Sequence, residues 1–199
     1  MSAPLAHLGA DAVHVVVDMQ RLFAEDTGWC VPALGEIVPN IRRLIEHRPA
    51  RALYTRFITP HGAEAARGVW QVYYRRWTQV TRAKISDDLF NLINPLAELA
   101  PAAAQVDKES FSALSSPQFA AALARLEAAP LVLSGVETDV CVLATALEAV
   151  ERGHRVVIAA DAVTSSSPPA HSATLDLILP RFEPMIDIAP TAAILKAWG

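Results

Sequence analysis

The sequence predicts an α/β fold: a single doubly wound domain over residues 1–199, with a six-stranded, mainly parallel sheet flanked by helices. Three observations predict this class. The 199 residues are 52% apolar and 19% charged, which suits one folded domain and excludes a disordered chain. Short apolar runs alternate with helical patterns along the chain. The runs lack polar alternation, which indicates parallel strands buried on both faces and joined by helical crossovers.

Three strands are expected in the first half of the chain. The run VHVVVD predicts a strand over Val13–Asp18, and similar runs predict strands over Arg51–Phe57 and Ala104–Lys108. Between the first two, apolar residues recur at i, i+4, i+7 and i+8 and predict a helix near Pro32–His47. Residues 62–93 are expected to be mostly helical and are rich in aromatic residues and arginine.

The second half repeats the alternation. Strands are expected at Leu131–Ser134, Arg155–Ala160 and Met185–Ile188. Two helices are expected to begin at Ser-Pro pairs, Ser116-Pro117 and Ser167-Pro168, because serine caps a helix and proline suits its first position. Another helix spans about Thr138–Arg152 and ends at Gly153, and a last helix runs to the C-terminus.

Charge and composition exclude several classes of partner. Lysine and arginine total 17 and aspartate and glutamate 21, so the net charge is −4, which disfavours nucleic acid and anionic lipid. No run reaches the roughly 20 apolar residues of a membrane span, and the first residues lack the pattern of a secretory signal. Two cysteines, Cys30 and Cys141, favour a reducing, cytoplasmic setting.

Three reactive side chains are expected at the sheet edge where ligands of open parallel sheets bind. Asp18 ends the first strand, Lys108 ends the third, and Cys141 lies in the first turn of the helix after the fourth. The helix dipole and Lys108 are expected to lower the pKa of the Cys141 thiol, and Asp18 to act as its general base. Backbone N–H groups of the Gly135–Cys141 turn are expected to bind an oxyanion. The alternatives are a core cysteine and an aspartate that only caps a helix or pairs with the lysine.

The motifs around these residues resemble those of the isochorismatase-like cysteine hydrolases over nearly the whole chain. The matching stretches are Asp18-Met19-Gln20 with Phe23, Tyr54-Thr55-Arg56, Lys108-Glu109-Ser110-Phe111-Ser112-Ala113, and Ser134-Gly135-Val136-Glu137-Thr138-Asp139-Val140-Cys141-Val142. The resemblance implies an Asp18–Lys108–Cys141 triad and a homodimer or homotetramer. It also implies a cis peptide bond before Glu137, whose N–H would join that of Cys141 in an oxyanion hole.

The substrate-binding residues are predicted less directly. Phe23 and Phe111 match aromatic pocket positions of the family, and Thr138 lies in the matched stretch. The segment 67–82 contributes further candidates: Trp70 and Trp77 as a pocket wall, with Arg56, Arg75 or Arg76 holding a substrate carboxylate. The same segment also fits a subunit interface, where Trp, Tyr and Arg are enriched. Both interpretations stay open at this point.

No metal and no other cofactor is expected. Family members that hydrolyse nicotinamide carry an Asp-x-His set after the second strand and a later histidine, whereas only His61 stands in the matching stretch here. The retained Cys141 favours a cysteine-dependent hydrolase of a small amide, ureido or N-carbamoyl compound, acting through a thioester. The alternatives are an isochorismatase-type vinyl-ether hydrolase that uses Asp18 without the thiol, and a non-catalytic binding or assembly module.

Overall fold

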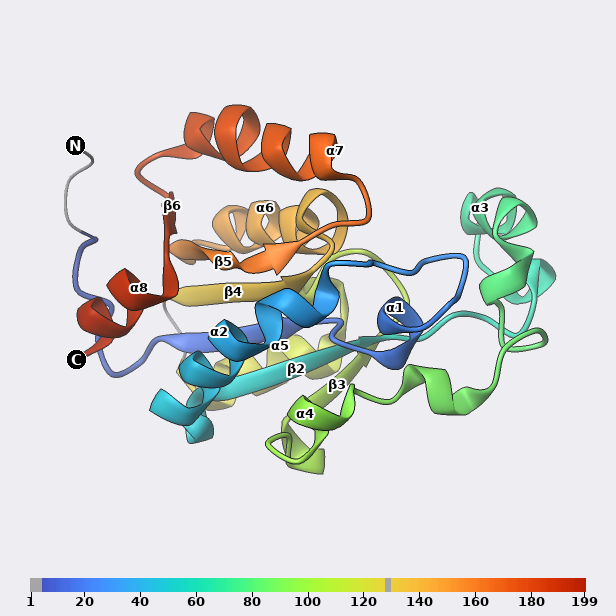
Figure 1. Ribbon diagram of the computed structural model, residues 1–199, viewed down its shortest axis with the longest axis horizontal. Coiled ribbons are helices and arrows are strands. Elements are labelled where there is room, and N and C mark those ends of the chain that lie inside the picture. Colours follow the sequence, from blue (N-terminus) through green and yellow to red (C-terminus); the bar gives the residue numbers. More distant parts are fainter. Residues whose placement is uncertain (1–4, 128–129) are drawn as a thin grey trace.

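Six parallel strands form the centre of the protein in a computed structural model that describes residues 5–127 and 130–199 (Figure 1). The strands are β1 (Val13–Val17), β2 (Ala52–Phe57), β3 (Gln105–Lys108), β4 (Leu131–Val136), β5 (Val156–Thr164) and β6 (Ile186–Ala189). Their order in the sheet is β3-β2-β1-β4-β5-β6, and every neighbouring pair is parallel. The predicted α/β class with a six-stranded parallel sheet is therefore confirmed.

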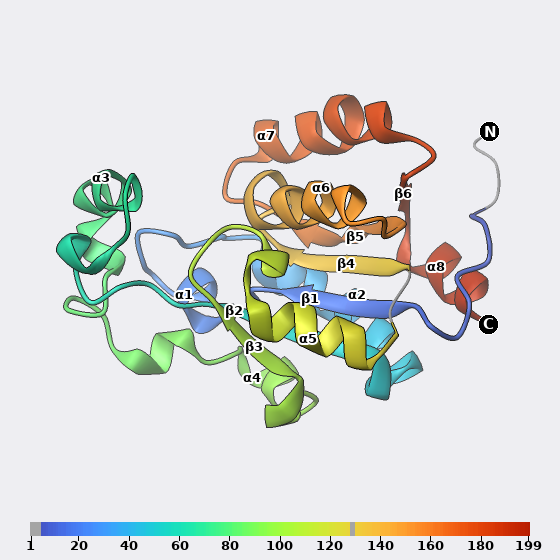
Figure 2. The same ribbon diagram turned by 180° about the vertical axis from the view of Figure 1, so that it is seen from behind.

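Helices cover both faces of this sheet. The helices are α1 (Arg21–Ala24), α2 (Leu34–His47), α3 (Trp70–Arg76), α4 (Asn94–Ala97), α5 (Pro117–Arg125), α6 (Leu143–Glu151), α7 (Pro168–Ala173) and α8 (Thr191–Trp198). α2 and α8 lie on the face toward the viewer in Figure 1, and α5 and α6 lie on the opposite face, which Figure 2 shows. The predicted apolar stripe of α2 is buried, including Ile41 and Leu44. Burial from both sides explains why the strands are continuously apolar.

The segment 62–93 is less helical than the sequence predicts. Its only α-helix is α3, and the next helix, α4, begins after the segment ends. The segment also contains three short 3₁₀ turns, at Ala63–Ala65, Thr78–Val80 and Asp87–Phe90. Gly68 interrupts the pattern with a positive φ of 54° just before α3. Most apolar side chains of this segment pack against the core of the domain, and residues 60–85, here called the lobe, project beyond the carboxyl ends of the strands (Figure 1).

Strand β4 continues two residues further than predicted, to Val136. Gly135 makes this possible, because it has a φ of 106° and lies directly against β1. A Cβ atom at this position would lie 2.0 Å from the backbone oxygen of Val17, so only glycine fits. β4 can thus run beside β1 as far as the turn that carries Cys141.

A buried histidine links the two central strands. His14 of β1 is fully buried, and its Nε2 lies 2.7 Å from the hydroxyl oxygen of Ser134 in β4. Burial lowers the pKa of His14 from 6.5 to about 3, because the charged imidazolium is not solvated there. The folded protein therefore holds His14 neutral at pH values where an unfolded chain protonates it.

This histidine is expected to make stability depend on pH. Below about pH 6.5 the unfolded state binds a proton that the folded state excludes, so the free energy of unfolding falls by about 1.4 kcal/mol per pH unit until about pH 3. Denaturant unfolding at about pH 7.5 and about pH 5 is expected to show a loss of about 2 kcal/mol that His14→Gln removes. The exposed His61→Gln variant is the control and should keep the loss. An unchanged loss in His14→Gln would contradict the assignment.

Candidate active site

The candidate site lies where the strand order reverses direction. The chain builds β1, β2 and β3 toward one edge and then returns to place β4 on the other side of β1. In open parallel sheets, ligands bind outside the carboxyl ends of the strands at this switch point. Asp18 follows β1, Lys108 ends β3, and Cys141 lies in the turn that follows β4. The topology thus collects the three predicted reactive groups on one side of the sheet.

The structure brings the carboxylate, the ammonium and the thiol into contact. The Lys108 Nζ atom lies 2.7 Å from Asp18 Oδ2 and 3.5 Å from Cys141 Sγ. All three side chains are buried, with exposed fractions of 0% for Asp18, 3% for Lys108 and 4% for Cys141. Such a buried ion pair persists only with close geometry and further hydrogen bonds, because desolvation of each charge opposes it.

Asp18 is held by a residue that sequence reasoning did not single out. The Thr55 hydroxyl of β2 donates to Asp18 Oδ1 at 2.6 Å and accepts from the Asp18 backbone N–H at 3.1 Å. Asp18 itself adopts a positive φ of 50°, which aspartate tolerates better than most residues. The available signal was a hydroxyl in an apolar strand within the motif Tyr54-Thr55-Arg56, but only the tertiary structure shows its partner.

Gln20 was also missed as a functional position, although it lies in the motif that begins at Asp18. Its side-chain oxygen accepts from the Phe57 backbone N–H at 2.6 Å, and its nitrogen donates to the Phe57 and Phe90 carbonyl oxygens at 3.1 and 2.9 Å. This fully buried amide joins the chain after β1 to the end of β2. It therefore fixes the position of Asp18 relative to the neighbouring strand.

The Lys108 ammonium group is fully engaged. It donates to the backbone oxygens of Ser110 and Phe111 at 2.9 and 3.0 Å in addition to its contacts with Asp18 and Cys141. It also lies 4.4 Å from the centroid of the Phe57 ring, within the range of a cation–π contact. With three donors on the ammonium, these partners leave it little freedom to move. Lys108 is thus a rigid positive charge beside Asp18 and the sulfur.

Cys141 lies in a wide helical turn. Residues Thr138–Val142 form one π-helical turn that leads into α6, so the thiol is at the start of the helix as the sequence predicts. The peptide bond between Val136 and Glu137 is cis, which confirms that part of the expectation. The oxyanion role of the Glu137 and Cys141 N–H groups stays a prediction.

The expected lowering of the Cys141 pKa is wrong. Burial raises the pKa of the thiol well above its usual range; the positive charge of Lys108 lowers it, but by less than burial raises it, and the Asp18 carboxylate raises it further. The helix dipole does not offset the loss of solvation at a side chain that is 4% exposed. The resting thiol is therefore protonated, and a base must remove its proton before attack.

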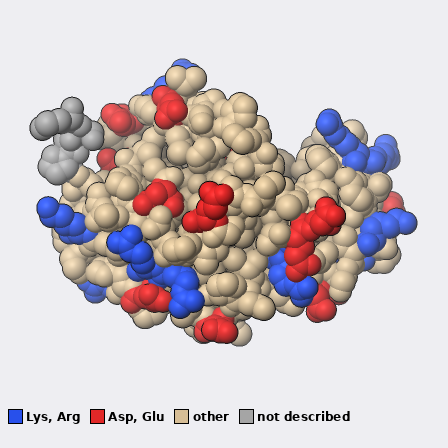
Figure 3. All heavy atoms as spheres, viewed as in Figure 1, with Lys and Arg blue, Asp and Glu red and all other residues tan. Residues whose placement is uncertain are grey.

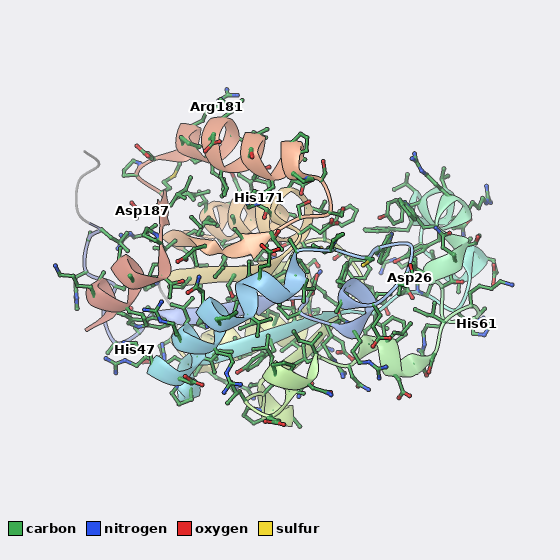
Figure 4. The ribbon with its side chains drawn as sticks, in the orientation of Figure 1. Asp26, His47, His61, His171, Arg181 and Asp187 are labelled. Carbon is green, nitrogen blue, oxygen red and sulfur yellow. The ribbon has the colours of Figure 1, made fainter. Side chains whose placement is uncertain are left out.

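Two side-chain contacts hold the turn after β4. One oxygen of the Glu137 carboxylate accepts from the Ser166 backbone N–H at 2.9 Å, from the Ser165 hydroxyl at 3.4 Å and from the Ser166 hydroxyl. The Thr138 hydroxyl lies 2.8 Å from Nδ1 of His171, which comes from α7 (Figure 4), and its role in substrate binding stays a prediction. The segment from β5 to α7 therefore supports the turn that carries Cys141.

An aromatic cluster connects the triad with the lobe. The aromatic cluster consists of Phe23, Trp29, Phe57, Trp70, Tyr73, Tyr74, Trp77 and Phe111. The closest pair is Trp70 and Phe111, with ring centroids 4.8 Å apart, and Phe57 contacts both. Four predicted substrate-binding residues thus meet in one cluster whose Phe57 ring touches the Lys108 ammonium. Their binding role stays a prediction.

Arg56 does not join this cluster, contrary to the expected carboxylate clamp. Its guanidinium pairs with Asp107 of the edge strand β3 through contacts of 2.7 and 3.0 Å. Strand alternation puts Arg56 on the face opposite Thr55 and Phe57. It lines a separate cavity of about 420 Å³ with Gln105, Asp107 and Gln118.

On the lobe, Lys and Arg side chains lie on the outer surface, beside a hollow between the lobe and the rest of the molecule (Figure 3).

The residues do not fit a metal site of the kind found in nicotinamide-hydrolysing members. His61 is exposed on the lobe (Figure 4). Within residues 5–127 and 130–199, no group of three or more His, Cys, Asp or Glu side chains is arranged to hold a metal ion. The absence of a cofactor stays a prediction.

The fold and the site together define the class of protein: a doubly wound α/β domain with a buried carboxylate, ammonium and thiol at the switch point of its sheet. Residues 12–190 match the isochorismatase domain, and the chain belongs to the isochorismatase family of hydrolases. It is 28% identical over 159 residues to an uncharacterized isochorismatase family protein of Bacillus subtilis, YaaI, covering 79% of this chain and 83% of that protein.

Solved structures agree in fold. A cysteine hydrolase from Pseudomonas syringae pv. phaseolicola is 24% identical, with a TM-score of 0.80 over 99% of this chain and 98% of that one. N-carbamoylsarcosine amidase from Thermoplasma acidophilum is 20% identical, with a TM-score of 0.68 over 90% of this chain and 96% of that one. At these identities the likeness establishes the fold, so the substrate has to be argued from the site.

The sequence predicts that the protein binds neither membrane nor nucleic acid and forms a homo-oligomer. None of the helices in the described part of the chain has the length and apolar character needed to span a membrane. The homodimer or homotetramer, which light scattering would measure, and the absence of nucleic-acid binding both stay predictions.

Proposed function

We propose that the protein is a cysteine-dependent hydrolase of the carbon–nitrogen bond in a small amide, ureido or N-carbamoyl compound. The observation that carries the proposal is the contact of Lys108 Nζ with both Asp18 Oδ2 and Cys141 Sγ, at 2.7 and 3.5 Å, inside a buried site. A nucleophile, a base and a fixed cation within hydrogen-bonding reach are the groups that acyl transfer requires. The amidase among the structural relatives supports the same reaction class.

The first half of the reaction forms a thioester. Asp18 accepts the proton of the Cys141 thiol, whose raised pKa makes this base necessary. The sulfur attacks the carbonyl carbon, and the oxyanion is stabilised by the backbone N–H groups of Glu137 and Cys141. When the tetrahedral intermediate collapses, the carbon–nitrogen bond breaks and Asp18 returns the proton to the leaving amine or ammonia. Lys108 keeps Asp18 oriented and balances its charge.

The second half regenerates the thiol. Asp18 accepts a proton from water as the water oxygen attacks the thioester carbon. The carbon–sulfur bond then breaks, the acid product leaves, and the proton passes from Asp18 to the Cys141 sulfur. The same carboxylate thus serves both halves, and Thr55, which holds one of its oxygens at 2.6 Å, preserves its orientation throughout.

Product analysis tests this proposal against its alternatives. The protein is incubated with a panel of primary amides, ureido compounds and N-carbamoyl amino acids, and ammonia is measured, while pyruvate release from isochorismate is followed in parallel. Ammonia release with an acyl adduct on the Cys141 peptide in mass spectrometry is the expected result. Pyruvate release without ammonia would instead assign vinyl-ether hydrolysis by Asp18, and neither product would favour a binding module.

The ion pair of Arg56 makes a further prediction about acidic substrates. Arg56→Gln is expected to change kcat/KM by less than about twofold for both N-carbamoylglycine and neutral phenylurea, because its guanidinium is paired with Asp107. Arg76→Ala is the comparison, since Arg76 is exposed on α3 and its guanidinium lies 5.9 Å from the Trp77 ring centroid. A loss confined to the acidic probe in Arg56→Gln would restore the carboxylate clamp.

A further inference from the structure

Glu137 anchors the turn that carries Cys141. Its backbone oxygen accepts from the N–H groups of Val140 and Val142, each at 3.1 Å. These two residues flank Cys141 in the chain, so the Cys141 N–H and side chain are tied to the position of the Glu137 backbone. Residues 137–142 are here called the nucleophile turn.

The register of the sheet brings a second segment to the same place. Val136, the last residue of β4, pairs with Thr164, the last residue of β5. Because the two strands are parallel, the next residues, Glu137 and Ser165, leave the sheet side by side. Ser165 is 5% exposed, and its hydroxyl oxygen also accepts from the Ser167 N–H at 3.2 Å. The segment after β5 is therefore an ordered support beside the nucleophile turn.

The Glu137 carboxylate joins these two segments. One oxygen, Oε1, accepts from the Ser166 backbone N–H at 2.9 Å, from the Ser165 hydroxyl at 3.4 Å and from the Ser166 hydroxyl. The ion pairs in the described part of the chain do not include Glu137. The carboxylate thus holds the turn through hydrogen bonds rather than through a counter-charge, so an amide oxygen at the same place can replace it.

The next residue of the turn is bound to the same support. The Thr138 hydroxyl lies 2.8 Å from Nδ1 of His171 in α7 (Figure 4), and the Thr138 backbone oxygen accepts from the N–H of Leu143 at the start of α6. Two adjacent residues of the nucleophile turn are therefore fixed by the segment after β5. That segment sets how the turn faces Asp18, which follows another strand.

We propose that Glu137 is a positioning residue for the oxyanion: its carboxylate, anchored on Ser165 and Ser166, sets the direction of the Glu137 and Cys141 N–H groups. The proposal rests on the proposed function and adds to it a side chain that matters when negative charge develops on the attacked carbonyl oxygen. Preorganised donors stabilise that charge only when surrounding contacts hold them to within about 0.5 Å of the productive geometry.

Two reactions of the same sulfur separate this role from a purely structural one. With p-nitrophenyl acetate, the Cys141 sulfur attacks the carbonyl carbon, an oxyanion forms, and the carbon–oxygen bond breaks to release p-nitrophenolate and leave a thioester. With iodoacetamide, the sulfur displaces iodide from a saturated carbon, and no oxyanion forms. Asp18 takes the thiol proton in both reactions. Acylation is followed as the p-nitrophenolate release that Cys141→Ala lacks, and alkylation by mass spectrometry of the Cys141 peptide.

Glu137→Ala is expected to lower the acylation rate about 10- to 100-fold and to leave the alkylation rate within about threefold of wild type. Glu137→Gln, whose amide oxygen can accept in place of Oε1, is expected to restore most of the lost acylation. Glu148→Ala is the matched control and should keep both rates, because Glu148 lies on α6 and pairs with Arg152 on the surface. An equal fall of both rates, unchanged acylation in Glu137→Ala, or no recovery in Glu137→Gln would overturn the proposal.

Variants on the other side of the contact test the same role with Glu137 in place. Ser165→Ala combined with Ser166→Ala removes two of the three donors and is expected to lower acylation about 3- to 10-fold without slowing alkylation. Adding Glu137→Ala to this pair should give no greater loss than Glu137→Ala alone, since the substitutions act through one contact. Losses that multiply instead would overturn the proposal. Wild-type protein that is alkylated but not acylated would overturn the proposed function itself, and this role of Glu137 with it.

Discussion

Replacing Cys141 with alanine is expected to lower kcat for carbon–nitrogen hydrolysis by about 10⁴-fold or more while the fold survives. The sulfur is the atom that bonds to the substrate carbon, and no other thiol lies beside Asp18 and Lys108 in the described residues. The substitution removes a single buried atom, so its effect on the free energy of unfolding is expected to be about 1 kcal/mol. The loss is therefore catalytic in origin.

Ammonia release measured on the purified variant checks this expectation, with thermal unfolding as the test of folding. Cys30→Ala is the matched control and should retain wild-type kcat, because Cys30 lies in the loop before α2 and is not a member of the triad. If Cys141→Ala keeps ammonia release within about tenfold of wild type, the thioester route is wrong, since an enzyme that loses its nucleophile does not retain such activity.

Asp18→Asn is expected to lower kcat by about 10²- to 10⁴-fold, the usual contribution of a general base, and to destabilise the protein as well. The amide does not accept the thiol proton, whose removal the buried site makes difficult. It also leaves the Lys108 ammonium buried without its negative partner, which is expected to reduce the free energy of unfolding by about 3–5 kcal/mol.

A double variant separates the two effects of this substitution. Asp18→Asn with Lys108→Met removes both charges, so most of the lost stability should return while kcat stays low. Asp107→Asn is the control for a partly exposed ion pair, that with Arg56, and should cost less than about 1 kcal/mol. Recovery of activity in the double variant would show that Asp18 acts only as the partner of Lys108 and would contradict its role as the base.

The predicted fold and triad follow from local patterns that the sequence displays directly. Apolar runs without polar alternation indicate parallel strands, and parallel strands present their carboxyl ends at one edge. Asp18, Lys108 and Cys141 stand at three of those ends, so their meeting is a consequence of topology. The cis bond before Glu137 came from the resemblance to the family, because no rule of composition or spacing predicts it.

The lobe shows where such reasoning fails. The aromatic residues of the lobe are spaced at helical intervals, so the sequence predicts a mostly helical segment. Several of their contacts are instead with Trp29 and Phe111, which are far away in the sequence. Arg56 was assigned to the pocket from its residue type alone. The register of β2 with β3 places it beside Asp107 instead, and no single-sequence pattern contains that register.

By itself, the sequence determined the α/β class, the edge of the sheet that holds the site and the three side chains that meet there. The tertiary structure alone decided the raised pKa of Cys141, the hydrogen bond from Thr55 to Asp18 and the pairing of Arg56 with Asp107. The physical reason is that strand ends are set by local periodicity, whereas solvation and hydrogen-bond partners depend on which distant segments exclude water from a group.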